Sequence, residues 1–283
     1  MDAEAEHERN AIQNFLIEVT LPIIATVQDT FCIIGTGTLF RIANRLFLVS
    51  AAHILDEFTP DRWAFPTGPH TGTIMTFGQA EFFRPNDESA DVCIAELKDP
   101  NVIAVLERSG WRILSLHNVW LPDYSADRVY LSGFPSVRAK FEQGNLKGRL
   151  FVVPTSLHAQ TPEATQYSAD AVTKGVDFFM DYKKPINELT GEDVSDVSIK
   201  GTSGCSIWGY RKIGWRRHGV WSPEASLCVI GVQSAFLKKD YLRGKSWGVV
   251  MIALSGIDDE IKNELTQTVE EIHRKLEAAR AAK

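Results

Sequence analysis

Cysteine is scarce in this sequence, and the few cysteines present are not paired. The chain has four in 283 residues, at positions 32, 93, 205 and 228, and none of them forms a CxxC pair. Zinc sites and disulfide frameworks in small proteins need closely or regularly spaced cysteines, so this spacing disfavours both. We expect four reduced thiols, most of them packed in cores, and no bound metal.

The sequence also lacks a leader-like start and a long apolar run. The first ten residues, "MDAEAEHERN", are acidic and polar, without the basic and apolar regions of a secretory signal. No apolar stretch is long enough to span a bilayer. Together with reduced cysteines, these absences predict a cytoplasmic protein that does not associate with a membrane.

An excess of positive charge is likewise missing. The net charge is −6, and lysine and arginine are scattered along the chain apart from a short cluster at residues 209–219, which we interpret as a solvated hairpin rather than a phosphate site; this disfavours a nucleic-acid partner. The composition is 44% hydrophobic and 23% charged, as in an ordinary globular protein. The length allows one large domain or two small ones, each with its own core.

What the sequence does contain is a series of short apolar runs rich in β-branched and aromatic residues. Residues 7–27 start with a helix-like pattern and become strand-like after Pro22. Many short strands predict a mostly β fold, either barrels or a sandwich. The runs lie at residues 32–53, where "RIANR" is a hairpin tip, and at 72–85, 90–97, 127–136, 149–160, 175–182, 225–236 and 246–254.

The last segment, residues 257–283, has a different periodicity. Its apolar residues recur at helical spacing, with acidic residues in the first turn and basic residues in the last, which suits the helix dipole. We therefore predict a terminal amphipathic helix whose apolar stripe packs on the β body. The stripe consists of Ile261, Leu265, Val269, Ile272 and Leu276.

Three polar residues at the ends of apolar runs suggest a reaction. His53 follows "LFLVSAA", Asp91 opens "DVCIAEL", and Ser203 lies between glycines in "GTSGCSIWGY". Each alone is also explained structurally, as a strand-end histidine, a capping aspartate and a turn serine. In the order His, Asp, Ser they match the needs of nucleophilic catalysis. Serine needs a histidine to accept its proton, and that histidine needs a carboxylate to orient it.

An oxyanion formed by serine attack also needs preorganised donors, usually backbone N–H groups. The backbone N–H groups of Gly201 and Ser203 supply them if the Gly201–Gly204 backbone curls around one point. Glycine on both sides of Ser203 gives the chain the freedom for such a turn.

At these motifs the chain resembles the chymotrypsin-like (trypsin-fold) serine peptidases. "GTGTLFRIANRLFLVSAAHIL" resembles the strand, hairpin and histidine strand of that family, "ADVCIAEL" its aspartate strand, and "GTSGCSIW" its nucleophile loop. "SGFP" resembles the opening of the second barrel, "VIGVQSAF" the strand beside the specificity pocket, and "WGVVMIAL" the closing strand before a terminal helix. The resemblance covers roughly residues 30–280.

The resemblance implies an architecture of two six-stranded antiparallel β-barrels with the active site between them. The first barrel would span residues 30–128 and the second 129–256, with a partly helical segment at 1–29 and a helix at 257–283. It implies no cofactor.

It also implies roles for individual residues. His53 would be the general base, Asp91 its orienting acid, Ser203 the nucleophile, and Gly201 and Ser203 the oxyanion donors. Substrate backbone would pair with Ser234, Ala235 and Phe236. Val197 would lie at the base of the specificity pocket, although a one-residue slip would bring Asp193 or Asp196 there.

Departures from the family pattern concern activation and location. Cys205 and Ser206 replace glycine and proline. Thr202 replaces the aspartate that receives a new N-terminus in zymogen activation, so we expect the intact chain to need no such cleavage. Leu39 and Ile54 stand in the neighbourhood of cysteines found in secreted members. The chain therefore resembles intracellular bacterial stand-alone relatives, some of which act as gated effectors with a sensor protein, including in anti-phage systems.

Three interpretations follow for the chain as a whole. The first is an active serine endopeptidase that cleaves proteins or peptides and is gated by an activating or sensor protein. The second is a latent or inactive trypsin fold that serves as a protein-binding module. The third is an unrelated β protein with a chance triad. Cys205 is a packed apolar thiol, a redox brake beside the oxyanion loop or, least favoured, the nucleophile itself.

Overall fold

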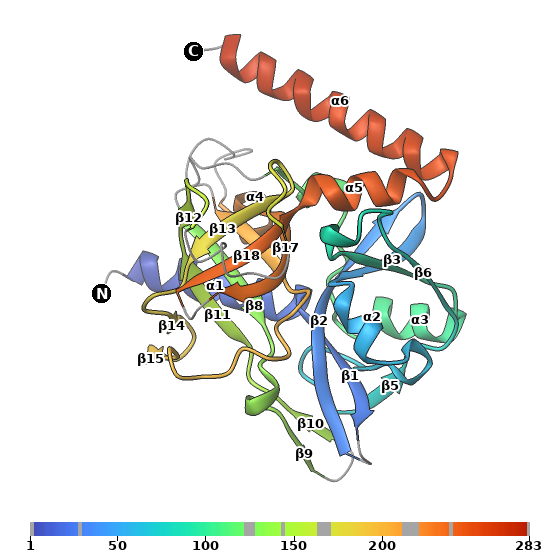
Figure 1. Ribbon diagram of the computed structural model, residues 1–283, viewed down its shortest axis with the longest axis vertical. Coiled ribbons are helices and arrows are strands. Elements are labelled where there is room, and N and C mark those ends of the chain that lie inside the picture. The colour runs from blue at the N-terminus through green and yellow to red at the C-terminus, as the bar shows by residue number, and fades with distance from the viewer. Residues whose placement is uncertain are drawn as a thin grey trace.

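The computed structural model describes residues 3–27, 30–121, 128–142, 145–162, 171–210, 221–237 and 240–281. It is mostly β, with two curled antiparallel sheets and several helices, and Figure 1 shows α5 and α6 at one end of the β body. The predicted mostly β class is confirmed. Each sheet has seven strands rather than the expected six, and the recorded pairings leave both sheets open at their ends.

The first sheet contains the strands that lead to His53 and Asp91. Its order is β5-β4-β1-β2-β3-β7-β6. The hairpin between β2 and β3 turns at Ala43 and Asn44, both with positive φ, as a tight two-residue hairpin requires, so the predicted tip is confirmed. The strands are β1 (Leu21–Val27), β2 (Thr30–Ile42), β3 (Arg45–Ser50), β4 (Ala64–Pro66), β5 (Ile74–Thr76), β6 (Ala80–Phe83) and β7 (Cys93–Leu97).

Strand β1 lies before the expected start of the first barrel at residue 30, yet it pairs with β2 along its whole length. Five of its seven residues are buried, so its apolar side chains belong to the first sheet and not to a separate segment. Strand β1 is therefore part of the first sheet.

The second sheet contains the strands around Ser203, in the order β11-β8-β16-β17-β18-β13-β12. Every residue of β16 is buried, which explains its continuous apolar sequence. Two short hairpins, β9 (Lys140–Glu142) with β10 (Asn145–Lys147) and β14 (Ile186–Asn187) with β15 (Glu192–Asp193), lie outside it. Its strands are β8 (Arg128–Gly133), β11 (Phe151–Thr155), β12 (Leu157–His158), β13 (Asp177–Asp181), β16 (Ser206–Tyr210), β17 (Leu227–Leu237) and β18 (Tyr241–Ser246).

Helices flank the two sheets. The side chain of Asp99 caps α3 by accepting from the backbone N–H groups of its first turn. None of the helices in the described ranges is both long and apolar enough to cross a membrane. The helices are α1 (Ala3–Val19), α2 (His53–Glu57), α3 (Pro100–Arg108), α4 (Pro223–Ser226), α5 (Trp247–Ser255) and α6 (Asp259–Ala281), with single turns η1 (Pro60–Arg62), η2 (Glu88–Ala90), η3 (Leu116–Asn118) and η4 (Ser136–Arg138).

The expected strand at residues 246–254 is wrong, because this segment forms helix α5. A continuous apolar run does not distinguish a buried strand from a buried helix by periodicity. Here β18 ends at Ser246, whose hydroxyl accepts a hydrogen bond from the Gly248 backbone N–H (3.2 Å) and caps the helix. Trp247 and Leu254 are then fully buried in the core that both sheets share.

The terminal helix is confirmed as α6, and the first part of its stripe packs as predicted. Ile261 and Leu265 are buried in the shared core. Val269 and Ile272 are half-buried and line a cavity beside α5. The side chain of Leu276 lies outside the described residues.

Buried polar contacts join the two sheets. The hydroxyls of Thr38 and Ser206 lie 2.7 Å apart, and those of Thr20 and Ser132 lie 2.9 Å apart. Within the second sheet, the Trp208 indole donates to the same Ser132 Oγ at 3.0 Å. Satisfied buried hydrogen bonds fix one relative placement of their elements, so β2 has a defined position against the second sheet.

Candidate active site

His53 and Asp91 are hydrogen-bonded to each other. Strand β3 ends at Ser50, and His53 begins the short helix α2 instead of ending the strand. Its Nδ1 lies 3.0 and 3.1 Å from the two carboxylate oxygens of Asp91, and its backbone N–H donates to Oδ1 at 3.0 Å. An ionised carboxylate only accepts hydrogen bonds, so Nδ1 carries the hydrogen and Nε2 keeps its lone pair.

Asp91 adopts an uncommon backbone conformation. Its φ is +44°, in the left-handed region that non-glycine residues rarely occupy. Ala90 and Val92 on either side are buried in the shared core and hold the chain there. Such strain persists where the surrounding structure determines it, and it concentrates at functional sites.

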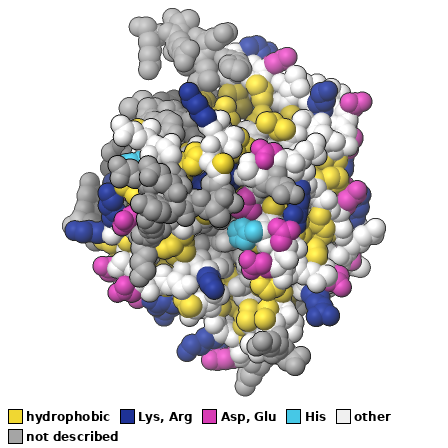
Figure 2. Space-filling model, viewed as in Figure 1, with side chains coloured by type: hydrophobic (Ala, Val, Ile, Leu, Met, Phe, Trp, Pro, Cys, Tyr) yellow, Lys and Arg dark blue, Asp and Glu magenta, His cyan; other side chains and the backbone are white. Residues whose placement is uncertain are grey.

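The charges around His53 favour its protonated form. Burial lowers the His53 pKa, whereas the Asp91 hydrogen bond and the negative charges of Asp91, Glu57 and Asp56 raise it. The result is a pKa above the ordinary value of 6.5. Figure 2 shows that acidic side chains are spread over this face of the molecule. Imidazolium formation is therefore assisted at this position.

The loop that carries Ser203 depends on two glycines with positive φ, Gly201 (+95°) and Gly204 (+84°). A Cβ on Gly204 would lie 2.1 Å from Ser50 Oγ and 2.5 Å from the Ala51 backbone nitrogen. The loop therefore packs directly on the end of β3, two residues before His53.

A second contact brings Ser203 towards His53 through strand β2. The Ser203 carbonyl accepts from the Thr36 backbone N–H at 2.8 Å. A Cβ on Gly35 would lie 3.3 Å from that carbonyl and 2.2 Å from the Ile54 side chain. Ser203 and the neighbour of His53 thus lie close to the same point of β2.

The N–H groups of the loop fall into two sets. For Gly201 and Ser203, none of the described residues accepts a hydrogen bond from the backbone N–H. These are the two groups expected to stabilise an oxyanion. The other three donate within the protein, from Thr202 to the Ile199 carbonyl (3.0 Å), from Gly204 to the Gln233 carbonyl (2.9 Å) and from Cys205 to the Thr202 carbonyl (3.0 Å).

The Ser203 hydroxyl is not hydrogen-bonded to the histidine. Within the described part of the chain, no hydrogen bond joins Ser203 Oγ to His53. Catalytic hydrogen bonds are often long without substrate and shorten when it binds. The structure therefore joins His53 to Asp91 directly and brings Ser203 near them through backbone packing.

The expected substrate strand is attached to the Ser203 loop. Gln233 of β17 accepts from the Gly204 N–H and donates its own N–H to the Cys205 carbonyl at 2.9 Å. The next residue, Ser234, is buried and lies at a bulge between Gln233 and Ala235. Phe236 is 36% exposed.

The aromatic ring of Phe236 is held from one side. The Tyr182 ring meets it edge to face, with ring centres 5.2 Å apart. Of the residues expected at the pocket base, Val197 is half-buried against a core cluster of the second sheet, whereas Asp193 and Asp196 are exposed.

Thr36 and Gln233 hold the loop, and the sequence motifs did not single them out. The Thr36 hydroxyl donates to the Gly201 carbonyl at 2.8 Å and accepts from the Phe134 N–H at 3.2 Å. The available signal was the "GTG" at residues 35–37, where glycines allow close approach of another backbone.

Cys205 is fully buried in a core cluster of the second sheet, which confirms its expected packing. Burial raises the pKa of its thiol well above the ordinary value. The thiolate is the nucleophilic form, so a buried thiol with a raised pKa is poorly suited to attack a substrate.

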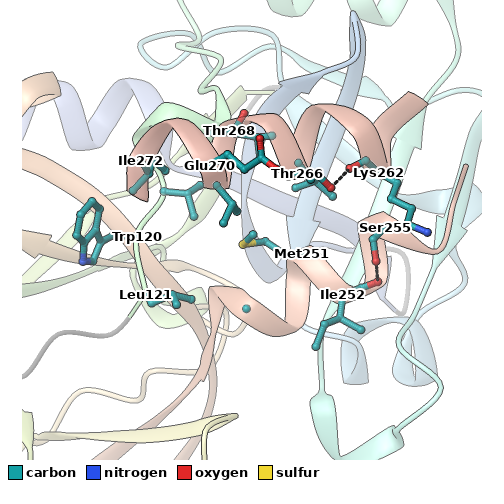
Figure 3. Close-up of a pocket in the computed structure, with 15 residues that line it drawn as sticks. Trp120, Leu121, Met251, Ile252, Ser255, Lys262, Thr266, Thr268, Glu270 and Ile272 are labelled. Carbon is teal, nitrogen blue, oxygen red and sulfur yellow. Dashed lines mark hydrogen bonds between the residues drawn. The ribbon is translucent and has the colours of Figure 1, made fainter. Parts of the chain in front are cut away.

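A large cavity lies away from these residues and contains no comparable set of reactive side chains. It measures about 640 Å³, lies between α5, α6 and the segment around Trp120, and has mainly apolar walls that include Leu121, Met251 and Ile272 (Figure 3). No nucleophile and base are paired in it. Across the described ranges, no group of three or more His, Cys, Asp or Glu is placed to hold a metal ion.

Comparison with known proteins assigns no family. No family model matches the chain, and no curated protein matches it. One similar solved structure is described as "Aromatic interactions drive the coupled folding and binding of the intrinsically disordered Sesbania mosaic virus VPg protein". It is 14% identical, with 84% of this chain and 90% of that chain covered, at a TM-score of 0.45. A likeness of this size supports no conclusion about fold or function.

The titration of His53 tests the site without any assay of activity. We expect its imidazole to titrate above pH 6.5, because Asp91 stabilises the charged form. This pair stabilises the folded state fully below pH 6.5, and the stabilisation is lost as pH rises through the raised pKa. Asp91→Asn should lower the midpoint, as followed by NMR of the ring protons. An unchanged midpoint in Asp91→Asn would show that Asp91 does not govern His53.

Proposed function

We propose that this chain is a serine endopeptidase of the chymotrypsin-like type, built on two β-barrels whose cleft holds the site. The observation that carries the proposal is the Ser203 loop, which packs on the end of β3 and leaves the N–H groups of Gly201 and Ser203 without an acceptor among the described residues. His53, oriented by Asp91, is attached to the same end of β3.

The proposed reaction uses these groups in two stages. His53 Nε2 removes the Ser203 proton while Oγ attacks the peptide carbonyl, and the oxyanion accepts hydrogen bonds from the backbone N–H groups of Gly201 and Ser203. Asp91 stabilises the imidazolium, which then protonates the leaving amine. Water, activated by His53, hydrolyses the acyl-enzyme and releases Ser203.

The substrate is a protein or peptide in extended form. Its backbone pairs with Ser234, Ala235 and Phe236 of β17. This strand is joined to the nucleophile loop by the backbone hydrogen bonds of Gln233 with Gly204 and Cys205. A half-buried Val197 at the pocket base, with Asp193 and Asp196 exposed, favours an uncharged side chain at the cleavage position.

The alternative function is a latent trypsin fold that binds proteins without cleaving them. The observation that favours it is the lack of a Ser203–His53 hydrogen bond within the described residues. An activating partner, such as a sensor protein, would connect the two functions by closing this gap when cleavage is required. Failure of Ser203 to react under every activating condition supports the binding role.

A fluorophosphonate probe tests the proposal, because it reacts with an activated serine. We expect labelling of the intact chain, loss of labelling in Ser203→Ala, and retention of most labelling in Cys205→Ala under reducing conditions. The reason is that the two oxyanion N–H groups flank Ser203 while the thiol is buried. Mass spectrometry identifies the modified residue. Labelling lost in Cys205→Ala but kept in Ser203→Ala would make this a cysteine peptidase.

A further inference from the structure

A buried ion cluster lies in the second sheet. The side chains of Arg243 and Lys245 are each 2% exposed, and that of Asp177 is fully buried. Both Arg243 and Lys245 donate to the Asp177 carboxylate at distances of 2.7–2.8 Å. Burial raises the Asp177 pKa, but the two cations more than offset this and hold it below its ordinary value.

Stability alone is a poor explanation for such a cluster. Taking three charges out of water is costly, and buried ion pairs replaced by apolar residues of similar size often leave a protein as stable or more stable. The position of the cluster is more informative. It lies where the segment before β13 meets the turn before Asp91.

Contacts lead from Asp177 to Asp91. The Thr173 backbone N–H donates to Asp177 Oδ2 at 2.7 Å, and the Thr173 hydroxyl lies 3.5 Å from that of Ser89. Ser89 belongs to η2, which ends one residue before Asp91. Since Asp91 has a strained backbone, its conformation depends on how firmly this turn is held.

The charge of Lys245 also reaches this turn. The pKa of Asp87 is lowered, mainly by its hydrogen bonds from Ser89; the positive charge of Lys245 lowers it further, and the negative charge of Asp177 opposes this. Ser89 and Lys245 thus act on the same aspartate from the two halves of the molecule.

The cluster touches the expected substrate strand as well. The Arg243 guanidinium donates hydrogen bonds to the Asp177 carboxylate, and the Arg243 backbone carbonyl accepts a hydrogen bond from the Ser234 hydroxyl at 3.3 Å. Arg243 also pairs with Ala235 beside the bulge in β17. One residue therefore links the buried carboxylate to the strand that would bind substrate.

We propose that Asp177, held by Arg243 and Lys245, is a positioning residue that sets the Asp91 turn and the Ser234 bulge relative to each other. This inference rests on the proposed function for its effect on cleavage. Its effect on His53 does not require cleavage, since Asp91 orients that histidine whether or not the chain is active.

The test replaces all three charges at once, so that no ion is left buried alone. In Asp177→Leu/Arg243→Met/Lys245→Met, we expect a folded protein in which the His53 midpoint moves down by about half a pH unit or more. If the chain cleaves peptides, kcat should fall by about tenfold to 100-fold with a smaller change in KM, because the reacting groups are misplaced. NMR and steady-state kinetics measure the two effects.

The controls separate position from stability. Glu18→Gln/Arg112→Met/Glu224→Gln removes the two ion pairs of Arg112, which involve none of the residues assigned to the site, and we expect its His53 midpoint and kcat to match the unmodified chain. Ser89→Ala removes the contact with Thr173, so it should shift the His53 midpoint in the same direction as the triple variant. It serves as the test if the triple variant does not fold.

The inference is overturned if the triple variant folds and its His53 midpoint is unchanged. If the triple variant does not fold, an unchanged His53 midpoint in Ser89→Ala overturns it. Lack of peptide cleavage by the unmodified chain, with the midpoint still shifted in the variants, rejects the proposed function alone.

Discussion

Replacing Ser203 by alanine is expected to abolish peptide cleavage while the protein stays folded. Ser203 is half-buried and makes no side-chain hydrogen bond to His53 within the described residues, so removal of its hydroxyl leaves the fold unharmed. Loss of the nucleophile should lower kcat by about 10⁴-fold or more. His53→Ala should have an effect of similar size, because the serine then has no base. Steady-state kinetics on a peptide substrate measures both.

The double variant distinguishes a cooperating triad from independent contributions. Residues that act as one unit have non-additive effects, so Ser203→Ala/His53→Ala should be little worse than either single variant. Circular dichroism spectra that match the unmodified chain are the control for folding. Near-normal turnover by either single variant is the result that rules out the mechanism.

Gly204→Ala is expected to have the largest effect on stability of any single methyl addition in the site. The new Cβ would lie 2.1 Å from Ser50 Oγ, 2.5 Å from the Ala51 nitrogen and 2.6 Å from the Thr36 carbonyl oxygen. Two of these atoms are backbone and have little room to move. The loop must therefore leave the end of β3, and cleavage should be lost together with stability.

Gly175 offers a matched control. Its φ of +83° is almost the same as the +84° of Gly204, but a Cβ there meets nothing within 4 Å. Gly175→Ala carries only the left-handed backbone cost of about 1–2 kcal/mol. Gly204→Ala adds the clash, and its free energy of unfolding should fall by about 1–3 kcal/mol more. Equal losses, measured by chemical denaturation, would show that Gly204 is not in close contact with β3.

The sequence predicted those parts of the fold that depend on local pattern. The hairpin tip at Ala43 and Asn44 was found because tight turns demand particular residues, and α6 because its apolar stripe has helical spacing. Helix α5 was missed because an apolar run buried on all sides has no informative period. The hydrogen bond by which Ser246 caps the start of this helix is a single contact.

The candidate site was predictable as a set of residues but not as an arrangement. Motif order pointed to His53 and Asp91, and the structure joins them at 3.0 Å. The roles of Thr36 and Asp177 arise from contacts between residues more than 60 positions apart, which periodicity and spacing do not reveal. The same limit applies to the strained backbone of Asp91, which tertiary packing imposes.

The contacts of Thr36 with the Ser203 loop have a consequence for the order in which the protein becomes competent. Thr36 is synthesised early, whereas the loop it holds, and strands β17 and β18 that support the loop, follow more than 160 residues later. Domains form N-terminal first during translation. A nascent chain that ends before the second sheet would thus lack both the oxyanion donors and the contacts that hold the Asp91 turn. If the proposed function holds, unfinished chains on the ribosome are harmless, and proteolytic capacity arises only when the second sheet closes onto the first.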